Sequence, residues 1–95
     1  MDTIDLRSQI DVLRKEGFAE AYVVDDPPGK LYPPHEHPYR SVHMIIEGEM
    51  SITSNGKTEV LHPGSRSDVG ANVSHEVTIG PNGCMYIVAE DQIAQ

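Results

Sequence analysis

Residues 35–48 read HEHPYRSVHMIIEG, and this stretch decides the fold. His35 and His37 are two residues apart, so on an extended backbone their imidazoles leave the same face. Two neutral imidazoles side by side suit a divalent transition metal. His43 has the same parity, but Pro38 can open a turn before it, so parity alone does not fix its direction. A His-x-His pair is also compatible with a polar loop that binds nothing.

The residues that follow the histidines predict strands. Val42–Ile46 is apolar on both faces, which indicates a strand buried on both sides, and Gly48 breaks the run. Asn55-Gly56 predicts a type I′ hairpin between two short strands. Short strands with turn signals between them predict an all-β antiparallel sandwich or barrel. The other predicted strands are residues 18–24, 50–54, 57–61, 65–69, 75–79 and 84–89.

Residues 3–16 predict one amphipathic helix, with an apolar stripe at helical spacing. Asp2 or Thr3 can cap its start, and Gly17 can take the left-handed conformation at its end. The helix is expected to pack on the β-structure as a lid, with a partner-binding helix as the alternative. The stripe consists of Leu6, Ile10 and Leu13.

The length and charge of the chain exclude several classes of function. Ninety-five residues suit a single domain, 1–95, with the helix at 3–16 and the barrel at 20–90. Fifteen acidic and seven basic residues give a net charge of −8, which argues against a nucleic-acid partner and against an anionic membrane surface. One cysteine and no long apolar run predict a soluble, cytoplasmic protein.

The combined pattern resembles the cupin family of small jelly-roll β-barrels. The first cupin motif places a glycine six residues before His-x-His, then a glutamate and a closing glycine. Gly29, His35, His37 and Gly48 match this spacing. A looser second motif follows, in which Pro63-Gly64 and Gly70-Ala71 precede His75. The motif glutamate falls at Ser41, which has no carboxylate to offer a metal.

The resemblance implies a metal site built from histidines alone. His35, His37 and His75 remain from the family's ligand set, and imidazoles alone bind Zn, Cu, Fe or Ni well. One divalent transition metal is expected, either one of these four or Mn. His43 lies two residues past the missing glutamate. It either supplies a fourth nitrogen or donates a hydrogen bond to metal-bound water. His62 lies in a turn and is expected to be solvated.

Two classes of function stay open at this point, because the cupin fold hosts many activities. One is a metal-dependent enzyme acting on a small molecule, with dioxygenase-like chemistry favoured and isomerase or lyase chemistry next. No side chain stands out as a general base. The other is a non-catalytic module that binds or senses a small molecule or a metal. Tyr32, Tyr39 and Arg40 flank the predicted site and can orient an anionic substrate or simply pack at the barrel rim.

A homodimer is also expected. Val42, Met44 and Ile46 form one apolar face of their strand, while His43 and Ile45 form the other. A barrel of this size fills its interior with only one of these faces. The helix stripe is narrow, so a second copy is expected to cover the rest of the outer face.

Overall fold

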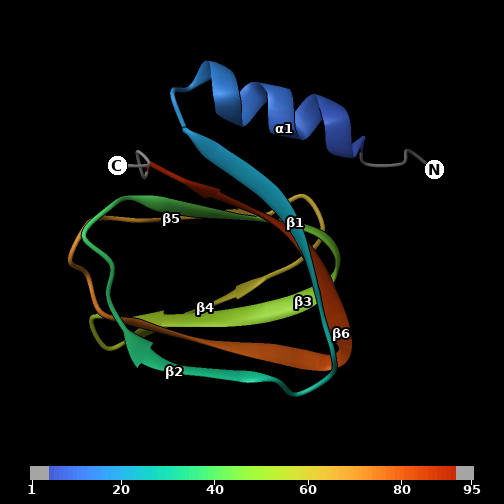
Figure 1. The fold of residues 1–95 in the computed structure, drawn as a ribbon. Coiled ribbons are helices and arrows are strands. Elements are labelled where there is room, and N and C mark those ends of the chain that lie inside the picture. The colour runs from blue at the N-terminus through green and yellow to red at the C-terminus, as the bar shows by residue number, and fades with distance from the viewer. Residues whose placement is uncertain (1–4, 92–95) are drawn as a thin grey trace.

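The computed structural model describes residues 5–91, which fold into one helix and a six-stranded antiparallel sheet that curls into a barrel (Figure 1). This confirms the predicted all-β class with an N-terminal helix. In chain order the elements are α1 (Leu6–Lys15), β1 (Glu20–Asp26), β2 (Leu31–His35), β3 (Ser41–Ser54), β4 (Lys57–Leu61), β5 (Arg66–Val69) and β6 (His75–Glu90).

The barrel consists of two layers that share their two long strands. In one layer, residues 84–90 of β6 pair with β1 and with residues 41–48 of β3, and β5 adds to β3. In the other layer, residues 75–79 of β6 pair with β2 and with residues 50–54 of β3, and β4 adds to β3. Because β3 and β6 run through both layers, they join them into one body (Figure 1).

The continuity of β3 and β6 differs from the sequence prediction, in which Gly48 and residues 80–83 each end a strand. Both long strands instead pass through these positions. The pairing between them shifts register between Ile45 and Glu47 and again between Gly48 and Met50. A bulge bends a strand without ending it, so each glycine-rich segment marks a bend from one layer to the other.

At Gly48 the backbone of β3 approaches that of β6 closely. Its φ is +78°, and it pairs with Cys84. A Cβ at this position would overlap the carbonyl oxygen of Gly83 and would lie 3.0 Å from the Cα of Cys84. The position therefore excludes a side chain for two reasons, its backbone conformation and the lack of space.

Two predicted turns are confirmed by their dihedral angles. Asn55 and Gly56 have φ of +54° and +75°, as a type I′ hairpin requires, and they connect β3 to β4. Gly17, just past the end of α1, has φ of +102°, which is the left-handed conformation expected there.

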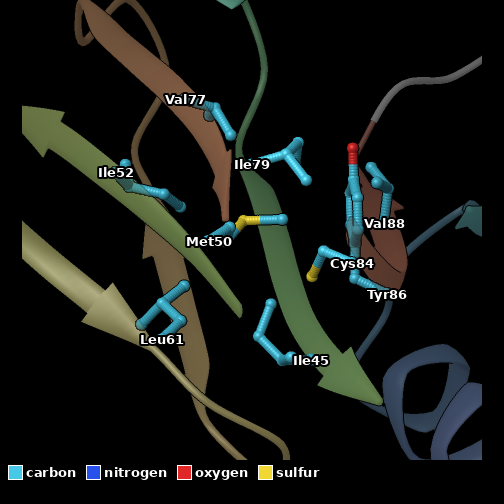
Figure 2. Close-up of a cluster of buried hydrophobic side chains, with 9 residues drawn as sticks. All are labelled: Ile45, Met50, Ile52, Leu61, Val77, Ile79, Cys84, Tyr86 and Val88. Atoms are coloured by element: carbon cyan, nitrogen blue, oxygen red, sulfur yellow. The ribbon is translucent and has the colours of Figure 1, made fainter. Parts of the chain in front are cut away.

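Two hydrophobic clusters lie on opposite sides of the shared strands. The first fills the space between the layers (Figure 2). The second lies under α1, where Leu13 is fully buried together with Phe18. Alternation along β3 sends Ile45 inward and its neighbours outward, as predicted. The inner cluster is Ile45, Met50, Ile52, Leu61, Val77, Ile79, Cys84, Tyr86 and Val88.

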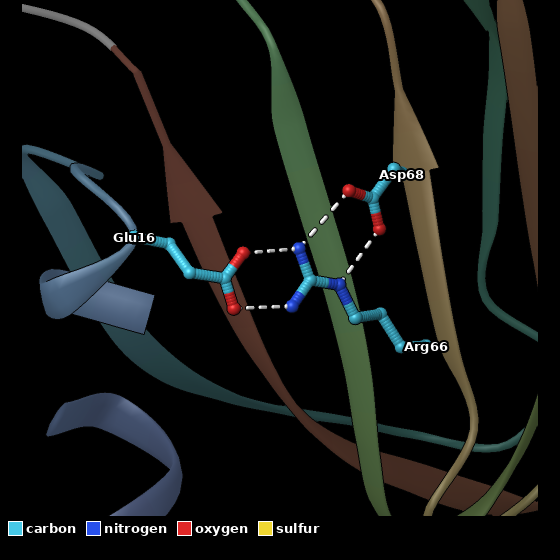
Figure 3. Close-up of polar contacts among 3 residues, drawn as sticks. All are labelled: Glu16, Arg66 and Asp68. Atoms are coloured by element: carbon cyan, nitrogen blue, oxygen red, sulfur yellow. Dashed lines mark hydrogen bonds and ion pairs between the residues drawn. The ribbon is translucent and has the colours of Figure 1, made fainter. Parts of the chain in front are cut away.

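Polar contacts hold α1 against the barrel in addition to this packing. The Asp5 carboxylate caps the helix by accepting from the backbone N–H of Arg7, whereas the predicted caps Asp2 and Thr3 lie outside the described residues. Arg66 of β5 makes two hydrogen bonds of 2.7 and 2.8 Å with Glu16, and it also bonds Asp68 (Figure 3). No helix within residues 5–91 is long and apolar enough to span a membrane.

The packing of α1 removes the reason given for a homodimer. That prediction assumes that the outer face of β3 needs a second copy to cover it. Val42, Met44 and Ile46 are at most 8% exposed within one chain, because α1 and Phe18 cover them. The oligomeric state stays a prediction, and this face does not support it.

Replacing Gly48 with Ala is expected to destabilise the fold by more than about 3 kcal/mol, because a left-handed conformation costs an L-residue about 1–2 kcal/mol and the clash with Gly83 adds to it. Gly56→Ala is the matched control, since its φ is +75° with nothing within 4 Å of an added Cβ. Urea unfolding of both variants measures the difference. Equal losses of stability would show that the close approach is not a constraint.

Candidate metal centre

The layer formed by β2 and β6 brings three histidines together. His35, the last residue of β2, pairs with His75, the first residue of β6. His37 lies in the turn after β2, and the Asn72 backbone N–H donates to its carbonyl oxygen at 2.6 Å. One nitrogen from each of the three rings lies within 4.8 Å of the other two. The ring centroids are 4.3 Å apart for His35 and His75 and 4.9 Å apart for His35 and His37.

In His35 and His75, Nδ1 bonds to a backbone carbonyl, which leaves Nε2 of each ring free. His35 Nδ1 lies 2.7 Å from the carbonyl oxygen of Pro33, and His75 Nδ1 lies 3.0 Å from that of Val73. A carbonyl oxygen only accepts, so each Nδ1 carries the proton and donates. The Nε2 lone pairs of His35 and His75 are then available to a metal. This is the arrangement in which backbone acceptors orient metal-binding histidines.

These residues fit a divalent transition metal that prefers nitrogen ligands. Three imidazoles satisfy the donor set of Zn, Ni, Cu or Fe, and they leave coordination positions for water or a ligand. The structure thus brings together three of the four predicted ligands. That they bind a metal stays a prediction.

His43 lies apart from this group, on the inner face of the other layer. It pairs with Val88 of β6 and with Ser67 of β5. Its ring centroid is 6.4 Å from that of His75, and its Nδ1 is fully shielded without a hydrogen-bond partner among residues 5–91. Burial, with a further contribution from the charges of His75, His35 and His37, lowers the pKa of His43 to about 4. His43 is therefore neutral at pH 7.

One cavity of about 240 Å³ connects the histidines to a wall of tyrosines. It opens between the two layers, and none of the described residues that line it is a lysine or an arginine. Histidine is therefore the one basic residue type among the described residues that line the cavity. The lining residues are Tyr22, Val24, Tyr32, His35, His37, Ser41, His43, His75, Val77, Tyr86, Val88 and Glu90.

The tyrosine protons in this cavity are all engaged by carboxylates. Tyr32 and Tyr86 donate to the same oxygen of Asp26, at 2.8 and 2.7 Å, and Asp26 is 6% exposed. Tyr22 donates to Glu90 at 2.6 Å. Burial first, and the bond to Glu90 second, raise the pKa of Tyr22, so it keeps its proton at neutral pH.

Several of these groups are absent from the sequence prediction. Asp26 and Glu90 both lie just outside the predicted strands, which are residues 18–24 and 84–89. Neither has a local signal, since each acquires its role from a partner far along the chain. Tyr86, Val88 and Glu90 alternate along β6 and so point to the same face of the sheet. This alternation is the sequence signal that could have placed the Glu90 carboxylate in the cavity.

Of the other residues singled out in the sequence, Tyr39 lies at the site, whereas Arg40 and His62 do not. Tyr39 stacks on His37, with ring centroids 4.9 Å apart, so it lies at the site. Arg40 turns away from it, and its guanidinium lies 4.4 Å from the ring centroid of Phe18. His62 is exposed, as predicted, with Nδ1 3.6 Å from Glu49.

The sequence pattern of the cupin domain matches residues 22–90, which is most of the chain. This chain is a cupin. The match covers β2 to β6 and all of β1 except its first two residues, and it includes the three clustered histidines. No curated protein is similar enough in sequence to count as a relative of this cupin.

Solved structures resemble this cupin over about three quarters of its length. The DMSP lyase DddQ from Ruegeria pomeroyi is 28% identical, with a TM-score of 0.71 over 79% of this chain and 39% of that one. An RmlC-like cupin from Shewanella frigidimarina is 25% identical, with a TM-score of 0.68 over 76% of this chain and 65% of that one. A cupin-like protein from Thermotoga maritima, 24% identical with a TM-score of 0.70 over 77% of this chain and 56% of that one, shares the fold. This cupin thus spans about two fifths of the lyase.

Replacing His37 with Ala is expected to weaken zinc binding by about 100-fold or more, since losing a ligand costs at least as much as losing a group that orients one. His62→Ala removes an exposed histidine outside the cluster and serves as the control. Calorimetry with zinc on both variants gives the comparison. Unchanged affinity in His37→Ala would show that the cluster is not the binding site.

Metal-free protein is expected to lose stability as the pH falls from 6.5 to 4. His43 has a folded pKa of about 4 and an unfolded value near 6.5, so the unfolded chain binds more protons in this window. The contribution of neutral His43 to the free energy of unfolding is fully present above pH 6.5. Its loss reaches about 3 kcal/mol at pH 4. Burial also lowers the pKa of His75, which acts in the same direction.

The measurement is urea unfolding at pH 7, 5.5 and 4.5 in the presence of a chelator. His43→Gln should flatten the pH dependence, and His62→Gln should leave it unchanged. A His43→Gln variant with the same pH profile as the parent would contradict the assignment to His43.

Proposed function

We propose that this cupin is a metal-dependent enzyme that acts on a small molecule in the cavity, by lyase-type chemistry. The observation that carries the proposal is the location of a three-histidine cluster and a carboxylate, Glu90, on the walls of one cavity. The 28% identity to a DMSP lyase supports the reaction class. Since this cupin spans only 39% of that lyase, the substrate named there is one candidate among several.

The three histidines would hold the metal that acts as the electrophile of the site. A divalent metal held by His35, His37 and His75 would draw electron density from a carbonyl or carboxylate oxygen and so acidify the adjacent carbon. The backbone bonds at Pro33 and Val73 keep the rings of His35 and His75 in the required tautomer.

Glu90 provides a proton acceptor, which the sequence alone did not reveal. Its carboxylate lines the cavity and accepts a hydrogen bond from Tyr22 at 2.6 Å. In an elimination, the proton leaves the activated carbon for Glu90. The C–H electron pair becomes the new C=C bond, and the leaving group departs with the electrons of its own bond. A carboxylate within reach of a bound ligand is a suitable general base for that step.

The cavity also limits the substrate. Its volume of about 240 Å³ is below the range typical of pockets for drug-sized ligands, so it restricts the substrate to a small molecule. Val24, Val77 and Val88 supply apolar wall between the polar groups. A small aliphatic molecule with one polar end fits this description.

A non-catalytic binding module is the second candidate. Its support is that the DMSP lyase has most of its chain outside the region shared with this cupin. In this reading the histidines and the cavity bind a small molecule or a metal without turnover. Oxygenase chemistry, which the sequence pattern favours, and isomerase chemistry are further outcomes of the same assay.

The test is turnover by protein loaded separately with Zn, Ni, Fe, Cu or Mn. Small carboxylates with a leaving group at the β-carbon, DMSP among them, are the substrates, and ultraviolet absorption of the new double bond is the readout. Glu90→Gln is expected to lower kcat by about 100-fold or more, with metal content unchanged. Glu59→Gln, on the exposed strand β4, is the matched control.

Three outcomes would change the proposal. Full activity in Glu90→Gln would show that another group takes the proton. Oxygen consumption or isomerisation in place of elimination would identify a different reaction class. Tight binding of these carboxylates without turnover under any metal would favour the binding module.

A further inference from the structure

Two buried polar atoms on one wall of the cavity have no hydrogen-bond partner within residues 5–91. They are the hydroxyl of Ser41 and Nδ1 of His43, two residues apart on the inward face of β3. Buried polar groups in folded proteins are nearly always paired, so the unpaired Nδ1 limits which nitrogen of His43 can carry the proton. Both residues line the same cavity as the histidine cluster.

The environment of Nδ1 determines which nitrogen of His43 carries the proton. Nδ1 is fully shielded and has no acceptor nearby, and a buried N–H without an acceptor is rarer than an unpaired acceptor. In the neutral ring the proton therefore resides on Nε2. Nε2 is the nitrogen left to face the cavity, so His43 presents an N–H donor there rather than a lone pair.

Apart from the unpaired hydroxyl of Ser41, the hydroxyl donors that line the cavity are not available to a ligand. The protons of Tyr32 and Tyr86 go to Asp26, and that of Tyr22 goes to Glu90. These tyrosines offer only lone pairs. His43 is thus the donor best placed for a ligand oxygen near the histidine cluster, with its ring centroid 6.4 Å from that of His75.

Charge and space at Ser41 point to the chemical class of the ligand. Ser41 stands at the position of the glutamate in the cupin motif, and its side chain, which lines the cavity, is much smaller than that of a glutamate. A divalent cation held by three neutral imidazoles carries two positive charges, and the carboxylate of Glu90, which also lines the cavity, balances only one of them. A small anion with a carboxylate group supplies both the missing charge and the missing oxygens.

We infer that the cavity binds a small carboxylate whose oxygen accepts a hydrogen bond from Nε2–H of His43, beside Ser41, in the space that a glutamate side chain would fill. His43 is then a ligand-binding donor and not a fourth metal ligand. The inference rests on the proposed binding of a metal and a small molecule in this cavity, but it does not depend on turnover.

The first experiment measures binding of propionate to zinc-loaded protein by calorimetry. His43→Phe keeps the ring and removes the donor, and it should weaken propionate binding by roughly tenfold to a hundredfold. His43→Gln keeps an N–H donor and should recover much of the affinity. His62→Phe, which changes an exposed histidine, is the matched control. Zinc stoichiometry is measured for each variant and should stay at one.

A second variant tests the space at Ser41. Ser41→Glu places a carboxylate in the chain itself, so zinc binding should persist while propionate binding is lost. Propionamide, which is neutral and of the same size, should bind the parent at least tenfold more weakly than propionate. Equal binding of propionate and propionamide would overturn the assignment of a carboxylate.

Nitrogen NMR of the histidines gives a readout that needs no propionate. His43 should be the Nε2–H tautomer at pH 7, and its nitrogen shifts should change little when zinc binds, in contrast to those of His35 and His75. An Nδ1–H tautomer, or a zinc-induced shift at His43 as large as at His75, would overturn the inference. So would unchanged propionate affinity in His43→Phe. A failed lyase assay with these binding results intact would refute the proposed reaction and leave the carboxylate site standing.

Discussion

The close approach of β3 and β6 at Gly48 is the constraint on which the rest of the structure depends. The two backbones leave no room for a Cβ there, so both long strands can bend together from one layer into the other. Without that shared bend, β3 and β6 would each belong to a single layer. The bend places His75, at one end of β6, against β2, and Glu90, at the other end, against β1. The cavity lies between them.

Successive side chains of β3 point to opposite faces, so one short segment supplies both packing residues on the outer face and a cavity residue on the inner face. Val42, Met44 and Ile46 face α1, while His43 and Ile45 face the interior. A shift of one residue would turn the outward set into the cavity and place His43 against α1. Two hydrogen bonds between Arg66 and Glu16, together with the packing of Leu13, hold α1 over these outward-facing side chains (Figure 3). The helix is therefore part of what keeps His43 inward.

Hydrogen bonds determine which polar groups of the cavity can still donate to a ligand and which can only accept. Backbone carbonyls take the Nδ1 protons of His35 and His75, and carboxylates take the tyrosine protons. What remains is a set of imidazole lone pairs on one wall, one imidazole donor on another, and a carboxylate at the end of β6. Under the proposed function, this division would give a metal, a ligand oxygen and a proton acceptor different places in a cavity of about 240 Å³.

The sequence by itself determined the fold class, the alternation of β3, the Asn55-Gly56 hairpin and the three histidines of the cluster, because each depends on local periodicity, turn chemistry or motif spacing. It could not determine that Gly48 bends a strand rather than ending it, since that depends on the Gly83 backbone from the other end of the chain. The tertiary structure alone decided that α1 covers the outer face, that His43 lies apart from the cluster and that Glu90 joins the cavity. Each of these is a contact between residues far apart in sequence, and no local pattern encodes which distant partner a side chain meets.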